Sequence, residues 1–181
     1  MRKEIEKLLQ SVQKPARYAG GELNSVMKDK SKVALRYAFC FPDTYEIGMS
    51  HLGMKILYGV ANAREDTWCE RVFAPADDME ALMRANGEPL FALESGDPIK
   101  DFDMIGFTMQ YELSYTNILN MLDLAGVPLR AEDRKSLTPI VAFGGPCACN
   151  PEPIADFVDI VILGEGEEVN IEVPDLYQRA K

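Results

Sequence analysis

Five apolar runs alternate with segments of helical periodicity along this 181-residue chain, and this alternation constrains its fold more than any other feature. The runs, which we expect to be strands, are 33–41, 68–74, 103–109, 139–143 and 158–163. The segments of helical character are 49–62, 77–86, 113–125 and 169–180, with a short helix or turn at 151–157. Strands that alternate with helices imply crossover connections and a parallel sheet. The chain is therefore predicted to be an α/β protein with a three-layer, flavodoxin-like fold and strand order 2-1-3-4-5.

The first 31 residues precede this alternation. Residues 2–14 carry apolar side chains at helical spacing, and Pro15 is expected to end that helix. Residues 15–32 are polar and contain the pair Gly20-Gly21, which indicates an irregular lead-in. We therefore divide the chain into an N-terminal helical extension, residues 1–31, and one domain, residues 32–181.

Local signals refine the expected helices. The helix at 49–62 is expected to bury one apolar face and to have Ser50 as its N-cap. That face consists of Leu52, Ile56, Leu57 and Val60. A short extra strand is expected at 90–93, and Pro174 argues against an unbroken last helix.

The two edges of the predicted sheet have different sequences. Strand 68–74 mixes Glu70 and Arg71 with apolar neighbours, which is typical of an edge strand. Strand 158–163 is almost wholly apolar, although the strand order places it at the other edge. Because an uncovered apolar edge promotes aggregation, we expect a dimer mate or a further domain to shield it.

Composition excludes several classes of partner. The chain has 19 Lys and Arg against 29 Asp and Glu, a net charge of -10, which repels phosphate backbones and anionic lipids. No apolar run approaches the roughly 20 residues that a membrane span needs, and the charged start is not followed by a signal-peptide core. We expect a cytoplasmic protein with neither nucleic acid nor a membrane as a partner.

The four cysteines do not predict a disulfide scaffold or a metal centre. Cys147 and Cys149 form a C-x-C pair, but no second pair accompanies them and His51 is the only histidine. No C-x-x-x-C-x-x-C run occurs, so this chain alone cannot hold a [4Fe-4S] cluster.

The loops that follow Phe41, Met109 and Phe143 should meet over one crevice, because ligands of open parallel sheets bind where the strand order reverses. Glycines at two of the predicted turns would allow a ligand close to the backbone, although a tight strand exit also explains a glycine pair. The candidate cofactor-binding residues are Asp43, Tyr45, Gly48, Ser50, His51, Thr108, Met109, Gln110, Gly144, Gly145, Pro146, Gly164, Glu165 and Gly166.

Several blocks of the sequence resemble a known family, and together they cover nearly the whole chain. Residues 139–146, 150–153 and 159–168 are similar to the second half of the cobalamin-binding domain at the N-terminus of many radical S-adenosylmethionine (SAM) enzymes. The blocks 15–22, 41–50, 71–75 and 110–117 resemble one uncharacterised branch of that family, the B12-binding radical SAM proteins or Fe-S oxidoreductases. Several matched blocks in the right order are a stronger signal than a lone glycine motif.

The resemblance implies a cobalamin-binding, Rossmann-type domain. A corrinoid would lie over the carboxyl ends of the strands, with its nucleotide tail beside the sheet. The [4Fe-4S] cluster and S-adenosylmethionine would belong to a downstream radical SAM domain, which is the expected partner, and this chain would catalyse nothing by itself. The stretch 164–167 leads toward that domain, so a hinge or docking role is expected for it.

One position departs from the pattern. Related cobalamin domains carry Asp-x-His-x-x-Gly after the first strand, with the histidine on cobalt, whereas this chain has Asp43, Tyr45 and Gly48 in that frame. A neutral phenol with a pKa near ~10 replaces an imidazole nitrogen poorly. We therefore expect cobalamin to bind without a histidine ligand from this loop, and we expect His51 to cap a helix or to face solvent.

Two alternatives remain open. The domain could have lost the cofactor and serve as a docking module, which Tyr45 supports. It could also be a flavin or nucleotide binder, but Pro42, Asp43 and Glu46 would oppose a phosphate after the first strand.

Overall fold

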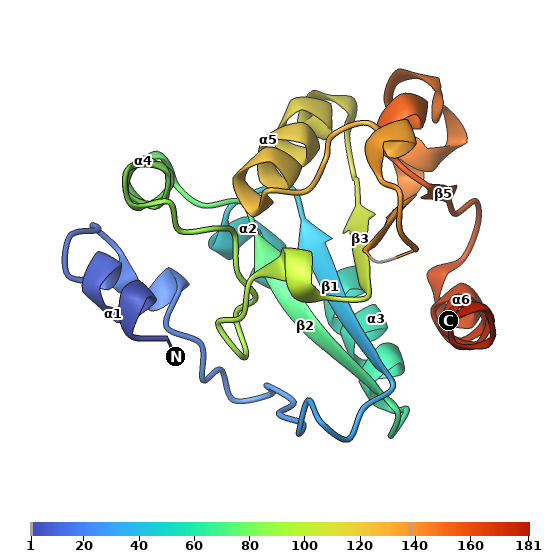
Figure 1. Cartoon of the computed structure of the whole chain (residues 1–181), viewed down its shortest axis with the longest axis horizontal. Coiled ribbons are helices and arrows are strands. Elements are labelled where there is room, and N and C mark those ends of the chain that lie inside the picture. Colours follow the sequence, from blue (N-terminus) through green and yellow to red (C-terminus); the bar gives the residue numbers. More distant parts are fainter. Residues whose placement is uncertain (1, 138) are drawn as a thin grey trace.

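Residues 2–137 and 139–181 are described by the computed structural model, and in them five strands form one sheet. The strands are β1 Leu35–Phe41, β2 Thr67–Phe73, β3 Met104–Thr108, β4 Ile140–Gly144 and β5 Ile160–Val161. They pair in parallel in the order β2-β1-β3-β4-β5 (Figure 1). The predicted fold class and strand order are confirmed.

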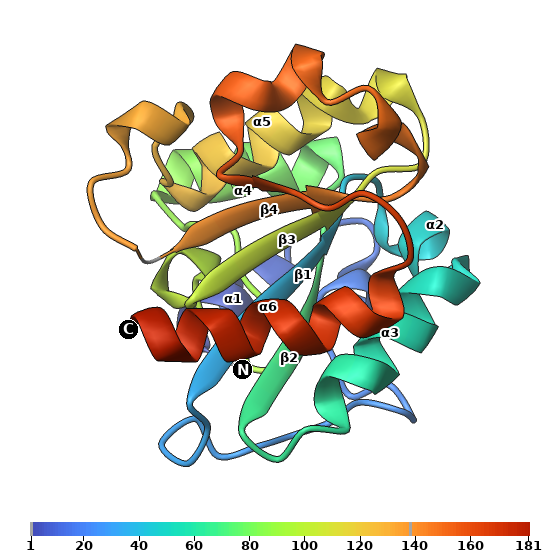
Figure 2. The same ribbon diagram turned by 90° about the vertical axis from the view of Figure 1, so that its right-hand side faces the viewer.

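Helices cover both faces of this sheet. They are α1 Lys3–Leu9, α2 Tyr45–Ser50, α3 Leu52–Asn62, α4 Asp77–Asn86, α5 Tyr115–Ala125 and α6 Gly166–Ala180. Helices α4 and α5 lie on one face, with α1 packed against α4, whereas α3 and α6 lie side by side on the other (Figures 1 and 2). The chain thus has the three layers that the alternation predicts.

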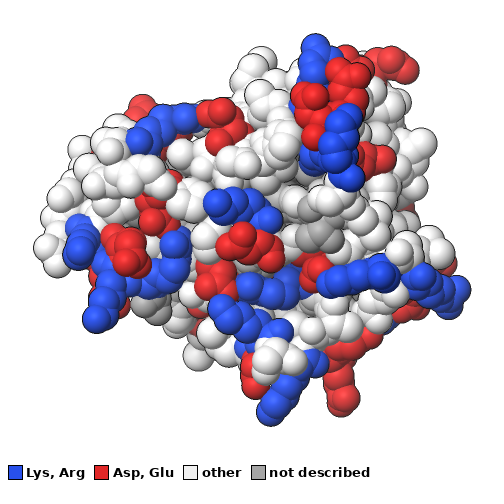
Figure 3. Space-filling view, viewed as in Figure 1, with Lys and Arg blue, Asp and Glu red and all other residues white. Residues whose placement is uncertain are grey.

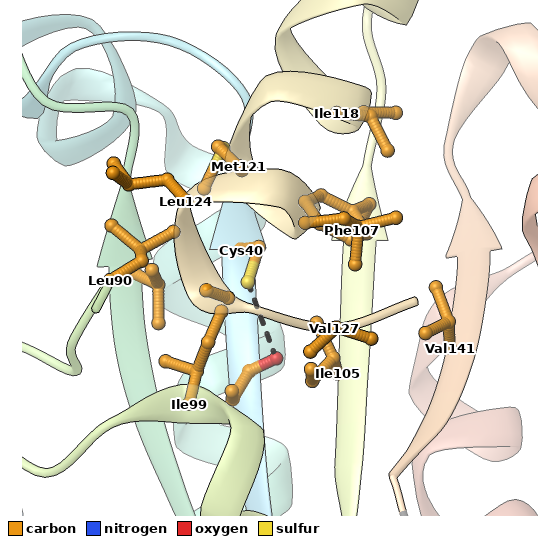
Figure 4. Close-up of a cluster of buried hydrophobic side chains, with 14 of the residues drawn as sticks. Cys40, Leu90, Ile99, Ile105, Phe107, Ile118, Met121, Leu124, Val127 and Val141 are labelled. Atoms are coloured by element: carbon orange, nitrogen blue, oxygen red, sulfur yellow. Dashed lines mark hydrogen bonds between the residues drawn. The ribbon is translucent and has the colours of Figure 1, made fainter. Parts of the chain in front are cut away.

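Strand β1 shows how side chains divide between the two cores. Tyr37 and Phe39 belong to the cluster under α3 and α6, whereas Ala38 and Cys40 belong to the cluster under α4 and α5. Figure 4 shows Cys40 among aliphatic and aromatic side chains of the second cluster, with its Sγ 3.7 Å from the carbonyl oxygen of Ala38. Because both faces are covered, the strands read as continuous apolar runs instead of alternating ones.

The segment 49–62 is two helices and not one, because His51 has an extended backbone between α2 and α3. The prediction of Ser50 as N-cap is wrong. The Ser50 hydroxyl donates to the carbonyl of Ile47 at 2.7 Å, and His51 caps α3 instead, its Nδ1 accepting from the backbone N–H of Met54 at 3.2 Å. The expectation that His51 caps a helix is confirmed.

The buried face of α3 differs in part from the predicted one. Met54, Tyr58 and Ala61 pack against the sheet, whereas Leu52 is 69% exposed and Ile56 is 44% exposed. The predicted apolar face is therefore wrong for Leu52 and Ile56, whereas Leu57 packs against the core as predicted. Helix α3 carries apolar side chains on two faces, and the sequence pattern alone does not indicate which face meets the sheet.

The lead-in residues pack along β2. The indole Nε1 of Trp68 donates to the carbonyl of Val26 at 2.9 Å, and Lys28 Nζ donates to three carbonyls that include that of Thr67. Strand β2 lies at an edge, as predicted, yet every residue in it is buried. Arg71 and Glu94 form a buried ion pair of 2.6 Å beside this edge.

Acidic and basic side chains alternate on the surface that includes this lead-in. Arg36 pairs with Asp97 at 2.9 Å, Lys30 pairs with the same carboxylate, and Arg84 pairs with Asp123 at 2.8 Å. Figure 3 shows the resulting mixture of blue and red over this face, with no broad single-sign area. The charges on this face are therefore largely used in local ion pairs.

Four other segments differ from expectation. Residues 90–93 form only an isolated antiparallel bridge, between Phe91 and Pro98, and not a strand. Helix α6 continues through the buried Pro174, and it begins at Gly166 instead of 169. The last strand is shortened to Ile160–Val161, and α1 ends at Leu9, before Pro15.

In the part of the chain that the structure describes, no helix has the length and apolar character to cross a membrane.

Candidate functional site

A cavity of about 420 Å³ lies at the carboxyl ends of β1, β3 and β4, on the sheet face that α3 and α6 cover. Side chains and backbone of these strands line it, together with the starts of α3 and α6. This is the place at which the strand order reverses, between β1 and β3. Ligand cavities in proteins are typically roughly 300–1,000 Å³, so this one has room for a moderate-sized group.

The floor of the cavity is made of residues with small or no side chains. Gly106 of β3 and Ala142 of β4 are register partners, and Thr108 pairs with Gly144 two residues further toward the carboxyl ends. The Tyr37 ring lies across Gly106, where an added Cβ would lie 2.4 Å from the Tyr37 hydroxyl oxygen. A larger residue at Gly106 would therefore displace Tyr37 and fill the slot.

The turn after β4 brings backbone close to the end of β3. Gly145 has φ of 98° and ψ of -177°, a conformation accessible essentially only to glycine. A Cβ at Gly145 would lie 2.7 Å from the carbonyl oxygen of Met109, and the N–H of Met109 donates to the carbonyl of Gly144 at 2.9 Å. Gly145 is therefore required for the tight strand exit, and the glycine pair also leaves the cavity rim without side chains.

The polar groups of the cavity are mostly neutral. The Gln110 amide donates to the Thr108 hydroxyl at 2.9 Å. Because Nδ1 of His51 accepts the Met54 N–H, the neutral imidazole carries its proton on Nε2 and is a donor there. Burial raises the pKa of Tyr37 well above its ordinary value, so its hydroxyl stays protonated. The acidic side chains at the rim are Glu165 and Glu167, at the start of α6.

Nine of the fourteen predicted site residues line this cavity. They are His51, Thr108, Gln110, Gly144, Gly145, Pro146, Gly164, Glu165 and Gly166. The structure thus brings together the turns that follow β3, β4 and β5, although Thr108 and Gly166 are far apart in sequence.

The other five predicted residues lie elsewhere, and four of them belong to the loop and helix after β1, which turn toward β2. The Tyr111 hydroxyl donates to Asp43 at 2.8 Å, and Met109 is fully buried in the other core. Gly48 packs against Phe73, and Ser50 ends α2 outside the cavity lining. The Tyr45 ring also contacts Phe73, edge to face at 5.5 Å.

Sequence reasoning missed the lining residues that lie within elements. Tyr37, Phe39 and Leu57 are part of apolar runs and were predicted only as core, yet they line the cavity. Gly106, inside β3, carries a usable signal, because glycine in a strand interior marks a close approach of other groups. Its partner Ala142 could be identified only from the register.

The cysteines are free thiols. Cys40 and Cys69 are buried, Cys147 is half-buried and Cys149 is exposed and lines the cavity. Among the described residues, no cluster of three His, Cys, Asp or Glu side chains could hold a metal ion.

Comparison with known proteins identifies the family. The model of the family "Radical SAM proteins, N-terminal" matches residues 53–181. The chain is 37% identical over 89 residues to the uncharacterized protein MJ0966 of Methanocaldococcus jannaschii, a match that covers 46% of this chain and 18% of that protein. The chain therefore spans a small part of that relative. No solved structure matches the chain. On the family match, which covers more than half of its residues, this chain belongs to the N-terminal domains of radical SAM proteins.

Proposed function

We propose that this domain binds a corrinoid and positions it for the catalytic domain of a radical SAM protein. The observation that carries the proposal is the cavity at the carboxyl ends of β1, β3 and β4, which continues as a slot over Gly106 and Ala142. Two further observations support corrinoid binding. Several sequence blocks resemble cobalamin-binding domains, and the chain belongs to the N-terminal domains of radical SAM proteins.

The size of the cavity indicates which part of a corrinoid it fits. At about 420 Å³ it is near the lower end of ligand cavities, roughly 300–1,000 Å³. It suits the nucleotide tail, and the much larger macrocycle would have to remain outside the slot, near the backbone of Gly144, Gly145 and Pro146. The absence of side chains on Gly144 and Gly145 favours such close contact.

Among residues 2–137 and 139–181, no imidazole nitrogen is free to bind cobalt. Tyr45, in the position of the motif histidine, does not line the cavity. Nδ1 of His51 is engaged with the Met54 N–H, and Nε2 then carries the proton. We therefore propose binding without a protein ligand to the metal, with Thr108 and Gln110 as polar contacts at the mouth.

When bound, the corrinoid would supply methyl transfer or radical rearrangement next to a [4Fe-4S] cluster and S-adenosylmethionine held by a further domain. The residues of this chain would bind and orient the cofactor and exclude water from it, since the difficult chemistry belongs to the cofactor. No catalytic residue is assigned to this chain.

The test is a titration of the 181-residue chain with hydroxocobalamin, followed by absorption spectroscopy and equilibrium dialysis. We expect saturable binding, and we expect Ala142→Leu to weaken it at least tenfold because leucine fills the slot. Ser50→Ala is the matched control, since Ser50 does not line the cavity. Circular dichroism would verify that Ala142→Leu is folded. The proposal is wrong if the wild-type chain does not bind, or if folded Ala142→Leu binds as tightly as wild type.

A second candidate is a cofactor-free docking domain, which the exposed apolar side chains favour. Leu52 and Ile56 on α3 and Ile171 on α6 are exposed, and Leu163, just before α6, is 67% exposed. Contiguous exposed apolar side chains mark interaction surfaces. Absence of corrinoid binding in the titration would favour this function, and a yellow protein on purification would instead indicate a flavin.

A further inference from the structure

Tyr37 is a mostly buried residue whose hydroxyl faces the cavity. Tyr37 is 7% exposed and its ring is tilted against Phe39, with ring centroids 5.7 Å apart. Its hydroxyl oxygen lies above Gly106, on the floor of the cavity. Within residues 2–137 and 139–181, this hydroxyl has no hydrogen-bond partner, whereas the hydroxyls of Tyr45, Tyr58 and Tyr111 each have one.

An unpaired hydroxyl in this position needs a physical reason. Among the described residues, Arg36 Nε is the fully buried side-chain polar atom without a partner, so the Tyr37 hydroxyl keeps contact with the cavity and can be satisfied there by water or by a ligand. Phenylalanine would supply the same ring without a polar group. The hydroxyl therefore indicates a partner that enters the cavity from outside.

The walls of the slot limit the shape of that partner. Gly106 and Ala142 form a flat floor, and Leu57 of α3 and Ile162 also line the space. Aromatic rings favour offset contact with other rings, and Phe39 lies beside Tyr37. A planar aromatic end group suits these walls, provided that it offers an acceptor to the hydroxyl.

We propose that Tyr37 donates a hydrogen bond to a ring nitrogen of the heterocyclic base at the end of the corrinoid's nucleotide tail. This inference rests on the proposed function. If the tail enters the slot, the nitrogen of its base is not bound to cobalt, and a buried nitrogen lone pair needs a donor. Tyr37 is the neutral donor on the floor of the slot, and it would thus select corrinoids that carry such a base.

The test compares two ligands and two Tyr→Phe variants. Wild type, Tyr37→Phe and Tyr58→Phe are titrated with hydroxocobalamin and with cobinamide, a corrinoid that lacks the nucleotide tail. Tyr58 is the matched control, because its hydroxyl accepts the Val26 N–H at 2.7 Å and it does not line the cavity. The free energy of unfolding of each variant is measured by urea denaturation without ligand.

We expect Tyr37→Phe to weaken hydroxocobalamin binding about fivefold to tenfold, the effect of one hydrogen bond, and to leave cobinamide binding unchanged. The free energy of unfolding of Tyr37→Phe should equal or exceed that of wild type, because the substitution removes no hydrogen bond from the unliganded chain. Tyr58→Phe should lose stability and keep both affinities. Equal hydroxocobalamin affinity in wild type and Tyr37→Phe, or an equal loss for both ligands, would overturn this inference while leaving the proposed function intact. A wild-type chain that binds neither ligand would refute both.

Discussion

The hydroxyl of Tyr45 donates a hydrogen bond of 3.2 Å to the carboxylate of Glu22, and this contact joins the loop after β1 to the N-terminal lead-in. Glu22 also accepts a weaker bond from Arg71, at 3.4 Å. Burial, followed by the charge of Glu22, raises the pKa of Tyr45. The residue that stands in place of the motif histidine is therefore part of a structural contact beside β2, outside the cavity.

Restoring the motif histidine should not create a cobalt ligand. We expect Tyr45→His to leave the absorption spectrum of the bound corrinoid unchanged, because position 45 does not line the cavity. Tyr45→Phe, which removes only the hydroxyl, should lower the free energy of unfolding by about 0.5–1.5 kcal/mol. Absorption spectra and urea denaturation measure the two effects. A spectral shift in Tyr45→His would show that this loop reaches the cofactor.

The two glycines after β4 should respond differently to alanine. Gly145→Ala should lower the free energy of unfolding by about 1–3 kcal/mol, because its positive φ and the nearby Met109 carbonyl exclude a Cβ. Gly144→Ala is the control, since its Cβ would make only ordinary contact with Ile162, at 3.6 Å, and it should stay within about 0.5 kcal/mol of wild type. Urea denaturation of both variants measures this. Equal effects would contradict the assigned turn geometry.

The cap of α3 should depend on an acceptor at position 51. His51→Ala removes the acceptor of the Met54 N–H and should cost about 1 kcal/mol of stability, the usual effect of losing an N-cap. His51→Asn keeps a side-chain acceptor and should restore most of the loss. Denaturant unfolding and the helical circular dichroism signal are the measurements. If His51→Asn and His51→Ala are equally unstable, the imidazole contributes through its ring contact with Phe41 instead.

Acid should weaken the attachment of α6. Arg64 donates two hydrogen bonds to Asp66 and one to Asp175 of α6, and Gln178 of α6 also donates to Asp66. The bonds from Arg64 lower the pKa of Asp66 below its usual value. A carboxyl with a depressed folded-state pKa stabilises the fold above its unfolded pKa, about 3.9, and this stability is lost as pH falls through the folded value.

We therefore expect the stability of wild type to fall below about pH 4, with part of the fall missing in Asp66→Asn. The difference in free energy of unfolding between wild type and Asp66→Asn should be modest, and it should be smaller at high salt, because Asp66 is partly exposed. Urea denaturation at a series of pH values measures it, at low and high salt. An identical acid dependence in wild type and Asp66→Asn would assign the loss to other carboxyls.

Local sequence patterns were enough to predict the class of each major element and the order of the strands in the sheet. Apolar runs between helical segments suffice for this, because periodicity is a local property and crossover connections of parallel strands follow one hand. The sequence also predicted that the loops after β1, β3 and β4 meet over one crevice, since they follow strands that end at one side of the sheet. The turns after β3 and β4 do line the cavity, whereas His51 is the one predicted residue after β1 that does so.

The direction of the loop after β1 and the interior of the cavity depend instead on contacts between distant parts of the chain. Tyr45 turns toward Glu22 and Phe73 because partners far away in sequence bury it, and α3 shows Leu52 to solvent because its other apolar face packs against the sheet. The slot exists because the register places Gly106 beside Ala142, under the ring of Tyr37. Such pairings join residues that are dozens of positions apart, and a local pattern contains no information about which of them will meet.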